Sequence, residues 1–229
     1  MAIEISQLNK IYNPDTDFPV HAVKALDLTI QAGEFVAIMG PSGSGKTTLL
    51  NLLSGLDNPT SGTVCINGCC LNELSEKQLS AFRRDNIGFI FQDYSLLPVL
   101  TAMENVEFVM QLQGKSELKC RQRATELLAQ VGLAELQHKR PANLSGGQQQ
   151  RVAVARALAS HPQFVMADEP TANLDAQSTA GLLDIMQQLN EKEGITFIFS
   201  THDPRVITRA RRVIVFEDGQ LKEDKFHVG

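Results

Sequence analysis

A phosphate-binding loop is predicted between residues 40 and 48. The run from Gly40 to Thr47, GPSGSGKT, matches the pattern G-x-x-x-x-G-K-[ST]. Glycines let the backbone curl until its N–H groups converge on phosphate oxygens, and the start of a following helix adds a favourable dipole. Lys46 can then reach the β- and γ-phosphates of a nucleotide, and the Thr47 hydroxyl can ligate Mg²⁺. The expected nucleotide-binding residues are Gly40, Pro41, Ser42, Gly43, Ser44, Gly45, Lys46, Thr47 and Thr48.

Two adjacent carboxylates follow a predicted strand at residues 164–168. The strand is apolar up to Asp168, and Glu169 comes next. A nucleotide site needs a carboxylate for its metal ion at a neighbouring strand end, and Asp168 suits that role. Glu169 could polarise an attacking water as a general base, which predicts hydrolysis and not binding alone. The alternative, a strand that ends in two solvated acids, is disfavoured by the phosphate loop elsewhere in the chain.

A second segment with the character of an anion site is LSGGQQQR, residues 144–151. Ser145, Gly146 and Gly147 are expected just before a helix, where a hydroxyl and backbone N–H groups can face a phosphate. The chain therefore carries two anion-binding helix starts but a single pair of candidate metal and base carboxylates. This imbalance raises the question of which nucleotide the second segment serves.

An α/β core with an all-helical insert is predicted to position these residues. Short apolar and β-branched runs predict strands at 21–30, 34–39, 62–68, 86–91, 164–168, 196–200 and 213–217. Helical spacing predicts helices at 46–56 (with Leu56 on the apolar face), 75–84, 101–114, 116–132, 148–160 and 176–193. Thr101 and Glu104 have the spacing of a capping box. The alternation implies a mainly parallel sheet covered by helices.

Composition excludes several function classes. The chain has 229 residues and a net charge of −5, which argues against a nucleic-acid binder that works through a global basic field. No basic region followed by an apolar stretch opens the chain, and no apolar run approaches the ~20 residues of a membrane span. A cytoplasmic protein is expected. The cysteines (Cys65, Cys69, Cys70 and Cys120) form no CxxC pair or zinc pattern, and the adjacent Cys69 and Cys70 are expected to be reduced thiols.

Other nucleotide-binding families fit less well. The guanine-reading pattern N-K-x-D of GTPases is absent after the phosphate loop, and small-molecule kinases have nothing like LSGGQQQR. From end to end the chain resembles the nucleotide-binding subunits of ABC transporters. The resemblance implies one ATP-binding domain over 1–229 with a P-loop NTPase (RecA-like) core at 1–91 and 161–229. It also implies an N-terminal antiparallel β part and a helical signature subdomain at 92–160.

The resemblance assigns roles to further residues. Gln92 resembles the Q-loop residue, which contacts Mg²⁺ or the attacking water, so Thr47, Gln92 and Asp168 are the expected metal-site residues. His202 resembles the switch histidine that contacts the γ-phosphate, and a strand-end histidine with no special role is the alternative. Tyr12 stands where the family places an aromatic that stacks on adenine, and a packed aromatic at the end of an edge strand is the alternative. The expected signature is Leu144, Ser145, Gly146, Gly147 and Gln148, and the expected D-loop is Asn173, Leu174 and Asp175.

In this family the signature meets the ATP held by the other subunit, which implies a head-to-tail homodimer around two ATP molecules. A separate transmembrane permease is implied, with the chain peripheral on the cytoplasmic face of the inner membrane. The chain is most similar to the group of the lipoprotein-release ATPase LolD, the exporter ATPase MacB and the cell-division ATPase FtsE. The sequence Asp93-Tyr94-Ser95 departs from the x-Phe-Asn stretch common there.

Several alternatives stay open. Residues 96–103 are either a permease-docking surface or simple core. The leading expectation is an exporter or lipoprotein-release ATPase, and an FtsE-like mechanotransmitter without transport is the second. Import of small solutes is a third. A soluble ABC ATPase of DNA repair or translation would need a long coiled-coil insert or a second cassette, and the sequence has neither.

Overall fold

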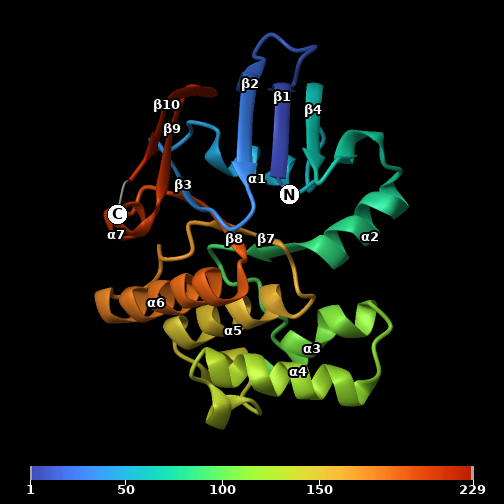
Figure 1. The fold of residues 1–229 in the computed structure, drawn as a ribbon, viewed down its shortest axis with the longest axis vertical. Coiled ribbons are helices and arrows are strands. Elements are labelled where there is room, and N and C mark those ends of the chain that lie inside the picture. Colours follow the sequence, from blue (N-terminus) through green and yellow to red (C-terminus); the bar gives the residue numbers. More distant parts are fainter. Residues whose placement is uncertain (1, 228–229) are drawn as a thin grey trace.

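Two β-sheets organise residues 2–227, the part of the chain that the computed structural model describes (Figure 1). The first sheet is antiparallel, in the order β2-β1-β4-β5, and consists of β1 (Ala2–Tyr12), β2 (Val20–Gln31), β4 (Ser61–Ile66) and β5 (Cys69–Cys70). The second has the order β10-β9-β3-β8-β7-β6 and consists of β3 (Phe35–Met39), β6 (Ile87–Ile90), β7 (Phe164–Asp168), β8 (Thr196–Thr201), β9 (Arg212–Glu217) and β10 (Gln220–Phe226). Only β10 pairs antiparallel in this sheet. The predicted α/β fold class is confirmed.

Helices surround the second sheet. They are α1 (Lys46–Leu53), α2 (Glu76–Asn86), α3 (Ala102–Leu112), α4 (Glu117–Gln130), α5 (Gly146–Leu158), α6 (Ala176–Glu193) and α7 (Pro204–Arg209). Short 3₁₀ turns lie at Leu71–Glu73, Ala134–Leu136 and Pro141–Asn143. Helices α3, α4 and α5 lie together at one end of the molecule (Figure 1). The predicted capping box at Thr101 and Glu104 is present and starts α3.

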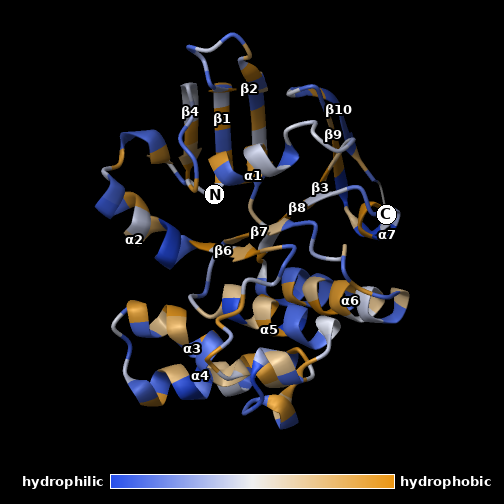
Figure 2. Ribbon diagram, turned by 180° about the vertical axis from the view of Figure 1, so that it is seen from behind, coloured by the Kyte–Doolittle hydropathy of each residue, from blue (hydrophilic) through white to orange (hydrophobic). Residues whose placement is uncertain are grey.

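The parallel strands are buried on both faces, so alternate residues pack against different helices. Phe164 and Met166 of β7 belong to an apolar cluster with α1, whereas Val165 and Ala167 belong to a second cluster with α3, α4 and α5. Figure 2 shows β6 and β7 largely in the hydrophobic colour, as expected for strands that carry apolar side chains on both faces. It follows that α1 and α5 cover opposite faces of the six-stranded sheet.

Two predicted helix bounds are wrong. Helix α1 ends at Leu53, because Gly55 adopts φ +67° and turns the chain away, so Leu56 is 46% exposed instead of buried. Helix α5 begins at Gly146, two residues earlier than expected. The cause is a capping box in which the Gln148 backbone N–H donates to the Ser145 hydroxyl and Ser145 N–H donates to the Gln148 side chain. The signature glycines therefore form the first turn of the helix.

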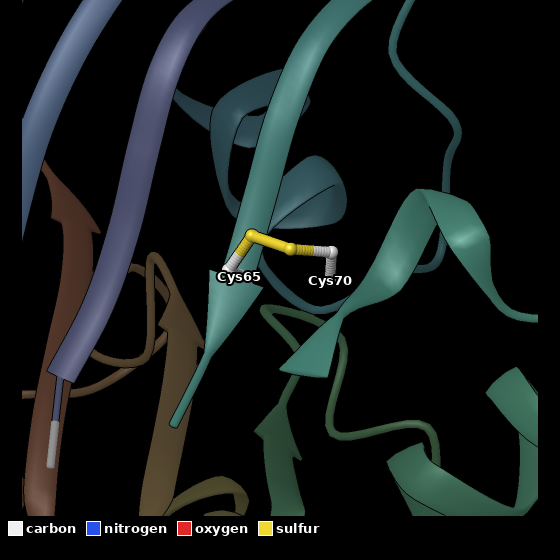
Figure 3. Close-up of a disulfide and its surroundings, with 2 residues drawn as sticks. All are labelled: Cys65 and Cys70. Atoms are coloured by element: carbon white, nitrogen blue, oxygen red, sulfur yellow. A yellow bond between two sulfur atoms is a disulfide. The ribbon is translucent and has the colours of Figure 1, made fainter. Parts of the chain in front are cut away.

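The expectation of a reduced thiol is wrong for Cys70 and confirmed for Cys69. Cys65 on β4 lies directly opposite Cys70 on β5, and the two form a disulfide (Figure 3). The two-residue turn at Asn67 and Gly68, both with positive φ, folds this hairpin tightly enough to bring them together. Cys69 and Cys120 are free.

No helix within residues 2–227 is long and apolar enough to cross a membrane. The predicted division into a core at 1–91 and 161–229 and a helical subdomain at 92–160 stays a prediction.

Candidate nucleotide site

The carboxyl ends of four parallel strands bring the predicted motifs together. Strands β3, β8, β7 and β6 are neighbours in that order, with Met39 opposite Thr201 and Asp168 opposite Ser200. The residues that follow these strands therefore meet at one edge of the sheet, where ligands bind in open α/β folds. Gly40 follows β3, His202 follows β8 and Glu169 follows β7.

A cleft of about 710 Å³ opens at this edge of the sheet. Its lining includes Tyr12, Ser42, Gly43, Ser44, Gly45, Lys46, Thr47, Thr48, Gln92, Glu169 and His202. Tyr12 and His202, which are 190 residues apart in the sequence, thus face one cavity. The structure therefore brings the predicted phosphate loop, the aromatic, the glutamine, the glutamate and the histidine to one place.

The phosphate loop is closely packed beneath the cleft. A Cβ on Gly40 would lie 2.0 Å from the carbonyl oxygen of Phe216, and one on Gly45 would lie 2.2 Å from that of Ala22. Gly45 also has φ +99°, which side-chain-bearing residues rarely adopt. Lys46 is buried, and its Nζ donates to the carbonyl oxygens of Gly40 and Pro41, at 2.8 and 2.9 Å. The lysine ammonium is thereby kept inside the loop.

Asp168 lies at the end of β7, next to the phosphate loop. The Thr47 hydroxyl donates to Asp168 Oδ1 at 3.1 Å. Burial raises the pKa of the Asp168 carboxyl above its ordinary value, with a smaller contribution from the negative charge of Glu169. The Thr47 hydrogen bond and the positive charge of Lys46 partly oppose this rise in pKa. A buried carboxylate with a raised pKa is a group that an added positive charge would stabilise.

Replacement of Asp168 by asparagine should stabilise the fold above acidic pH. Because the pKa of Asp168 is higher in the folded state, the folded protein holds more protons than the unfolded chain between pH 3.8 and that raised value. Stability is therefore lost as pH rises through this window, and a neutral asparagine removes that loss. Urea denaturation without nucleotide, from pH 4 to pH 8, should give a higher free energy of unfolding for the variant than for the wild type. This difference should grow as the pH rises and then become constant. An advantage that does not change with pH would contradict this explanation.

Glu169 is held by two partners from the end of β8. Its Oε1 lies 2.7 Å from His202 Nδ1, and its Oε2 accepts a hydrogen bond from the Thr201 hydroxyl at 3.2 Å. Its backbone N–H donates to the carbonyl of Ser200 at 2.8 Å, and its φ is +44°. The glutamate side chain is 14% exposed, whereas that of His202 is 75% exposed. A side chain fixed in an uncommon backbone conformation beside a cleft is a frequent feature of functional sites.

Tyr12 lies at the wall of the cleft. It ends β1, which is an interior strand of its sheet rather than the edge strand of the alternative. The Tyr12 hydroxyl donates to Asp57 Oδ2 at 2.7 Å, and the ammonium of Lys10 lies 4.8 Å from the ring centre. Burial is the largest cause of the raised pKa of Tyr12. The ring is thus fixed by two partners beside the cleft.

The predicted D-loop connects to the predicted Q-loop. Asn173 Nδ2 donates to the carbonyl oxygen of Gln92 at 3.0 Å. Leu174 packs against the larger apolar cluster. Asp175 is the N-cap of α6, where its carboxylate accepts hydrogen bonds from the backbone N–H and the hydroxyl of Ser178 at 2.8 and 2.6 Å. Asp175 thus starts a helix in this chain.

The signature segment does not join the phosphate loop in the same chain. Ser145, Gly147 and Gln148 line another cleft, of about 260 Å³, together with Ser178. Leu144 is buried below them. Because α5 and α1 cover opposite faces of the sheet, their first turns belong to different surfaces. The two predicted anion sites are therefore separate in one subunit.

Several residues that line the nucleotide-site cleft carry no sequence signal. Val20, His21, Ala22 and Lys24 come from β2, and Asp218 comes from the turn between β9 and β10. These segments approach the phosphate loop only because the two sheets meet there. The Asp-Gly pair at residues 218 and 219 is a sequence signal for the turn between β9 and β10, and both residues have positive φ, but nothing in the sequence places this turn at the cleft.

Comparison with known proteins identifies relatives along almost the whole chain. Residues 23–172 match the family described as ABC transporter. The macrolide export ATP-binding/permease protein MacB of Hyphomonas neptunium is 47% identical over 97% of this chain and 34% of its own length. The lipoprotein-releasing system ATP-binding protein LolD 1 of Rhodopseudomonas palustris is 43% identical, with 96% of this chain and 97% of that protein covered. The chain spans about a third of the length of the MacB relatives that it matches.

The fold is also that of solved structures. A dimeric, post-hydrolysis structure of the ATP-binding cassette MJ0796 bound to ADP and Pi matches with a TM-score of 0.92 and 40% identity over 99% of both chains. That protein is from Methanocaldococcus jannaschii. The family match covers most of the nucleotide-site motifs, and the structural match covers the complete fold. The chain therefore belongs to the ABC transporter family and is one of its ATPase cassettes.

Proposed function

We propose that this chain binds and hydrolyses ATP in a head-to-tail homodimer and drives a separate membrane permease of the exporter or lipoprotein-release type. The observation that carries this proposal is the separation of the two anion-binding segments. The phosphate loop opens onto the cleft of about 710 Å³, whereas the signature lies at the start of a helix on the opposite face of the sheet. When two copies lie head to tail, each nucleotide contacts the phosphate loop of one subunit and the signature of the other.

Nucleotide binding starts with the phosphate loop. Lys46 moves its ammonium from the carbonyls of Gly40 and Pro41 to the β- and γ-phosphates, where it meets a full negative charge. Gly43 has open space where a Cβ would stand, so the loop backbone can approach a ligand closely there. Tyr12, fixed by Asp57 and Lys10, provides an aromatic surface for the adenine.

Magnesium fits the donor groups of this site. The Thr47 hydroxyl and the Asp168 carboxylate are 3.1 Å apart, and oxygen donors of this kind suit Mg²⁺. Within residues 2–227, no cluster of three or more His, Cys, Asp or Glu side chains could hold a metal alone, so phosphate oxygens and water would complete the shell. Thr47, Asp168 and Gln92 would hold the ion, which neutralises phosphate charge when bound.

Hydrolysis depends on Glu169. Its carboxylate stands at the cleft with one oxygen on His202 and the other on Thr201, so its orientation is set before ATP arrives. A water between Glu169 and the γ-phosphate transfers a proton toward the carboxylate as it attacks phosphorus. His202, which is largely exposed, holds Glu169 in position and can also approach the γ-phosphate. ADP and phosphate are the products.

The permease is a separate chain in this proposal, and the cassette is peripheral on the cytoplasmic face of the membrane. The group to which MacB and LolD belong supports an exporter or lipoprotein-release system. Exposed apolar side chains at Leu97, Val99 and Phe108 support a protein contact on the helical end of the molecule.

Purification of the tagged chain from its native membrane in mild detergent tests this partner. Mass spectrometry should identify one co-purifying permease, and reconstitution with it should raise the ATPase rate severalfold. A matched preparation of Leu97→Asp should lose the permease while keeping its own ATPase rate. Absence of any membrane protein would contradict the proposal. A partner that stimulates hydrolysis but moves no substrate would favour an FtsE-like mechanotransmitter instead.

A further inference from the structure

The segment after Gln92 has an uncommon backbone that α5 holds in place. Tyr94 and Ser95 both have positive φ, at 64° and 46°, which two successive residues other than glycine seldom adopt. Arg156 near the end of α5 donates to the carbonyl oxygens of both residues, and its bond to Tyr94 is 2.9 Å long. Because the same helix begins at the signature, α5 connects these two parts of the site rigidly.

The Tyr94 side chain also reaches the other end of α5. A Cβ added to Gly146 would lie 2.8 Å from the Tyr94 hydroxyl oxygen and 3.8 Å from the ring carbon that carries it. The phenol therefore covers Gly146, the first residue of the helix. The tyrosine is half-buried, and burial raises its pKa, so it stays neutral. No residue between 2 and 227 gives the Tyr94 hydroxyl a hydrogen bond in this structure, so packing alone fixes the contact.

The predicted D-loop completes the same contact. The Asn173 side chain bonds the Gln92 carbonyl, and the Asn173 carbonyl oxygen lies 3.7 Å from the position of a Cβ on Gly146. Gln92 itself lines the nucleotide cleft, whereas Tyr94 does not. Tyr94 thus stands between the cleft of its own subunit and the signature that would face the partner's ATP.

We propose that Tyr94 is a positioning residue that couples the Gln92 segment to the signature glycine of the same subunit. This inference rests on the proposed ATP-dependent dimer. When the dimer closes, the phenol against Gly146 makes the signature follow the Gln92 segment, so the first turn of α5 arrives in the orientation that its partner's nucleotide needs. A smaller side chain leaves the bonds from Arg156 to the backbone of Tyr94 and Ser95 but removes the contact at Gly146, so the first turn of α5 follows the Gln92 segment less closely.

The first test uses dimerisation in the Glu169→Gln background, measured by light scattering as ATP is added. Tyr94→Ala should raise the ATP concentration for half-maximal dimer at least about tenfold, because the signature is no longer held. Tyr94→Phe keeps the ring, so its ATP concentration for half-maximal dimer should stay within about threefold of that of Glu169→Gln alone. ADP affinity by calorimetry should be unchanged in both, since Tyr94 does not line the cleft. Leu118→Ala, an exposed truncation on α4, is the matched control.

The second test uses the steric contact itself. In the wild-type background, Gly146→Ala should lower the ATP turnover rate about tenfold, because its methyl group meets the Tyr94 hydroxyl. Tyr94→Phe in that variant removes the hydroxyl oxygen and should raise the ATP turnover rate at least about threefold above that of Gly146→Ala alone. Circular dichroism of every variant confirms that each one is folded.

The outcomes separate this inference from the proposed function. If the Glu169→Gln protein with Tyr94 intact stays monomeric in saturating ATP, the proposed dimer is wrong. If that reference dimerises but Tyr94→Ala dimerises equally well, only the role of Tyr94 is wrong. A Tyr94→Ala effect that appears equally in ADP affinity would also overturn it, as would a Gly146→Ala defect that Tyr94→Phe does not relieve.

Discussion

Replacement of Glu169 by glutamine should lower the rate of ATP hydrolysis at least about a hundredfold while ATP still binds. The amide has nearly the same shape as the carboxylate but cannot accept the proton of the attacking water. Thr201 and His202 can still hold the amide oxygen and nitrogen, so the local structure should persist. Phosphate release under saturating ATP, together with ATP affinity by filter binding, measures the two effects separately.

The matched control for this change is Glu126→Gln, which makes the same substitution on the exposed face of α4. Its hydrolysis rate should equal that of the wild type. A Glu169→Gln protein that hydrolyses ATP at near the wild-type rate would show that another group activates the water. A loss of ATP binding in that variant would instead make Glu169 a binding residue.

Replacement of Lys46 by alanine should lower ATP affinity at least about a hundredfold, because each charge-assisted bond to a phosphate contributes roughly 1.5–3 kcal/mol. The structure adds a second cost. Without the ammonium, the carbonyl oxygens of Gly40 and Pro41 lose the donor that neutralises them. These carbonyls would then repel the phosphates that the loop must accept. Calorimetric titration with ATP measures the change directly.

Lys119→Ala removes the same charge from an exposed position on α4 and serves as the control for net charge. It should bind ATP like the wild type. If Lys46→Ala bound ATP within about threefold of the wild type, the lysine would not contact the phosphates in the bound state. An equal loss in both lysine variants would point to general attraction by the protein charge rather than to a contact.

Much of the nucleotide site could be predicted because its residues are local in sequence. The phosphate loop and the Asp168–Glu169 pair each follow a strand, and parallel strands in one sheet bring their carboxyl ends to the same edge. The capping box at Thr101 was equally local and is present. The roles of Gln92 and His202 could be predicted only from the family resemblance, because an isolated Phe-Gln or Thr-His pair does not indicate a function.

The unpredicted contacts are those that depend on how distant segments pack. The contact between His202 and Glu169 depends on the register of β7 against β8. The contact between Tyr94 and Gly146 depends on two successive residues with positive φ, Tyr94 and Ser95. The bond between Cys65 and Cys70 was missed although Asn-Gly between them is a turn signal that could have revealed the hairpin. Leu56 was misplaced for a similar local reason, because Gly55 ends the helix before it.

The central claim is that each ATP is held by the phosphate loop of one subunit and the signature of its partner. Two inactive variants test it. Lys46→Ala disables the loop but keeps the signature. Ser145→Asp keeps an N-cap residue for α5 but sets a negative charge where the partner's γ-phosphate must lie. A dimer of one chain of each kind has one fully intact site and one doubly disabled site.

The decisive measurement is ATP hydrolysis after mixing equal amounts of these two variants. Each alone should turn over ATP at no more than about one per cent of the wild-type rate. Because about half of the dimers are mixed and each has one of two sites intact, the mixture should reach about a quarter of the wild-type rate. A mixture no faster than the mean of its two components would contradict shared sites and, with them, the proposed dimer.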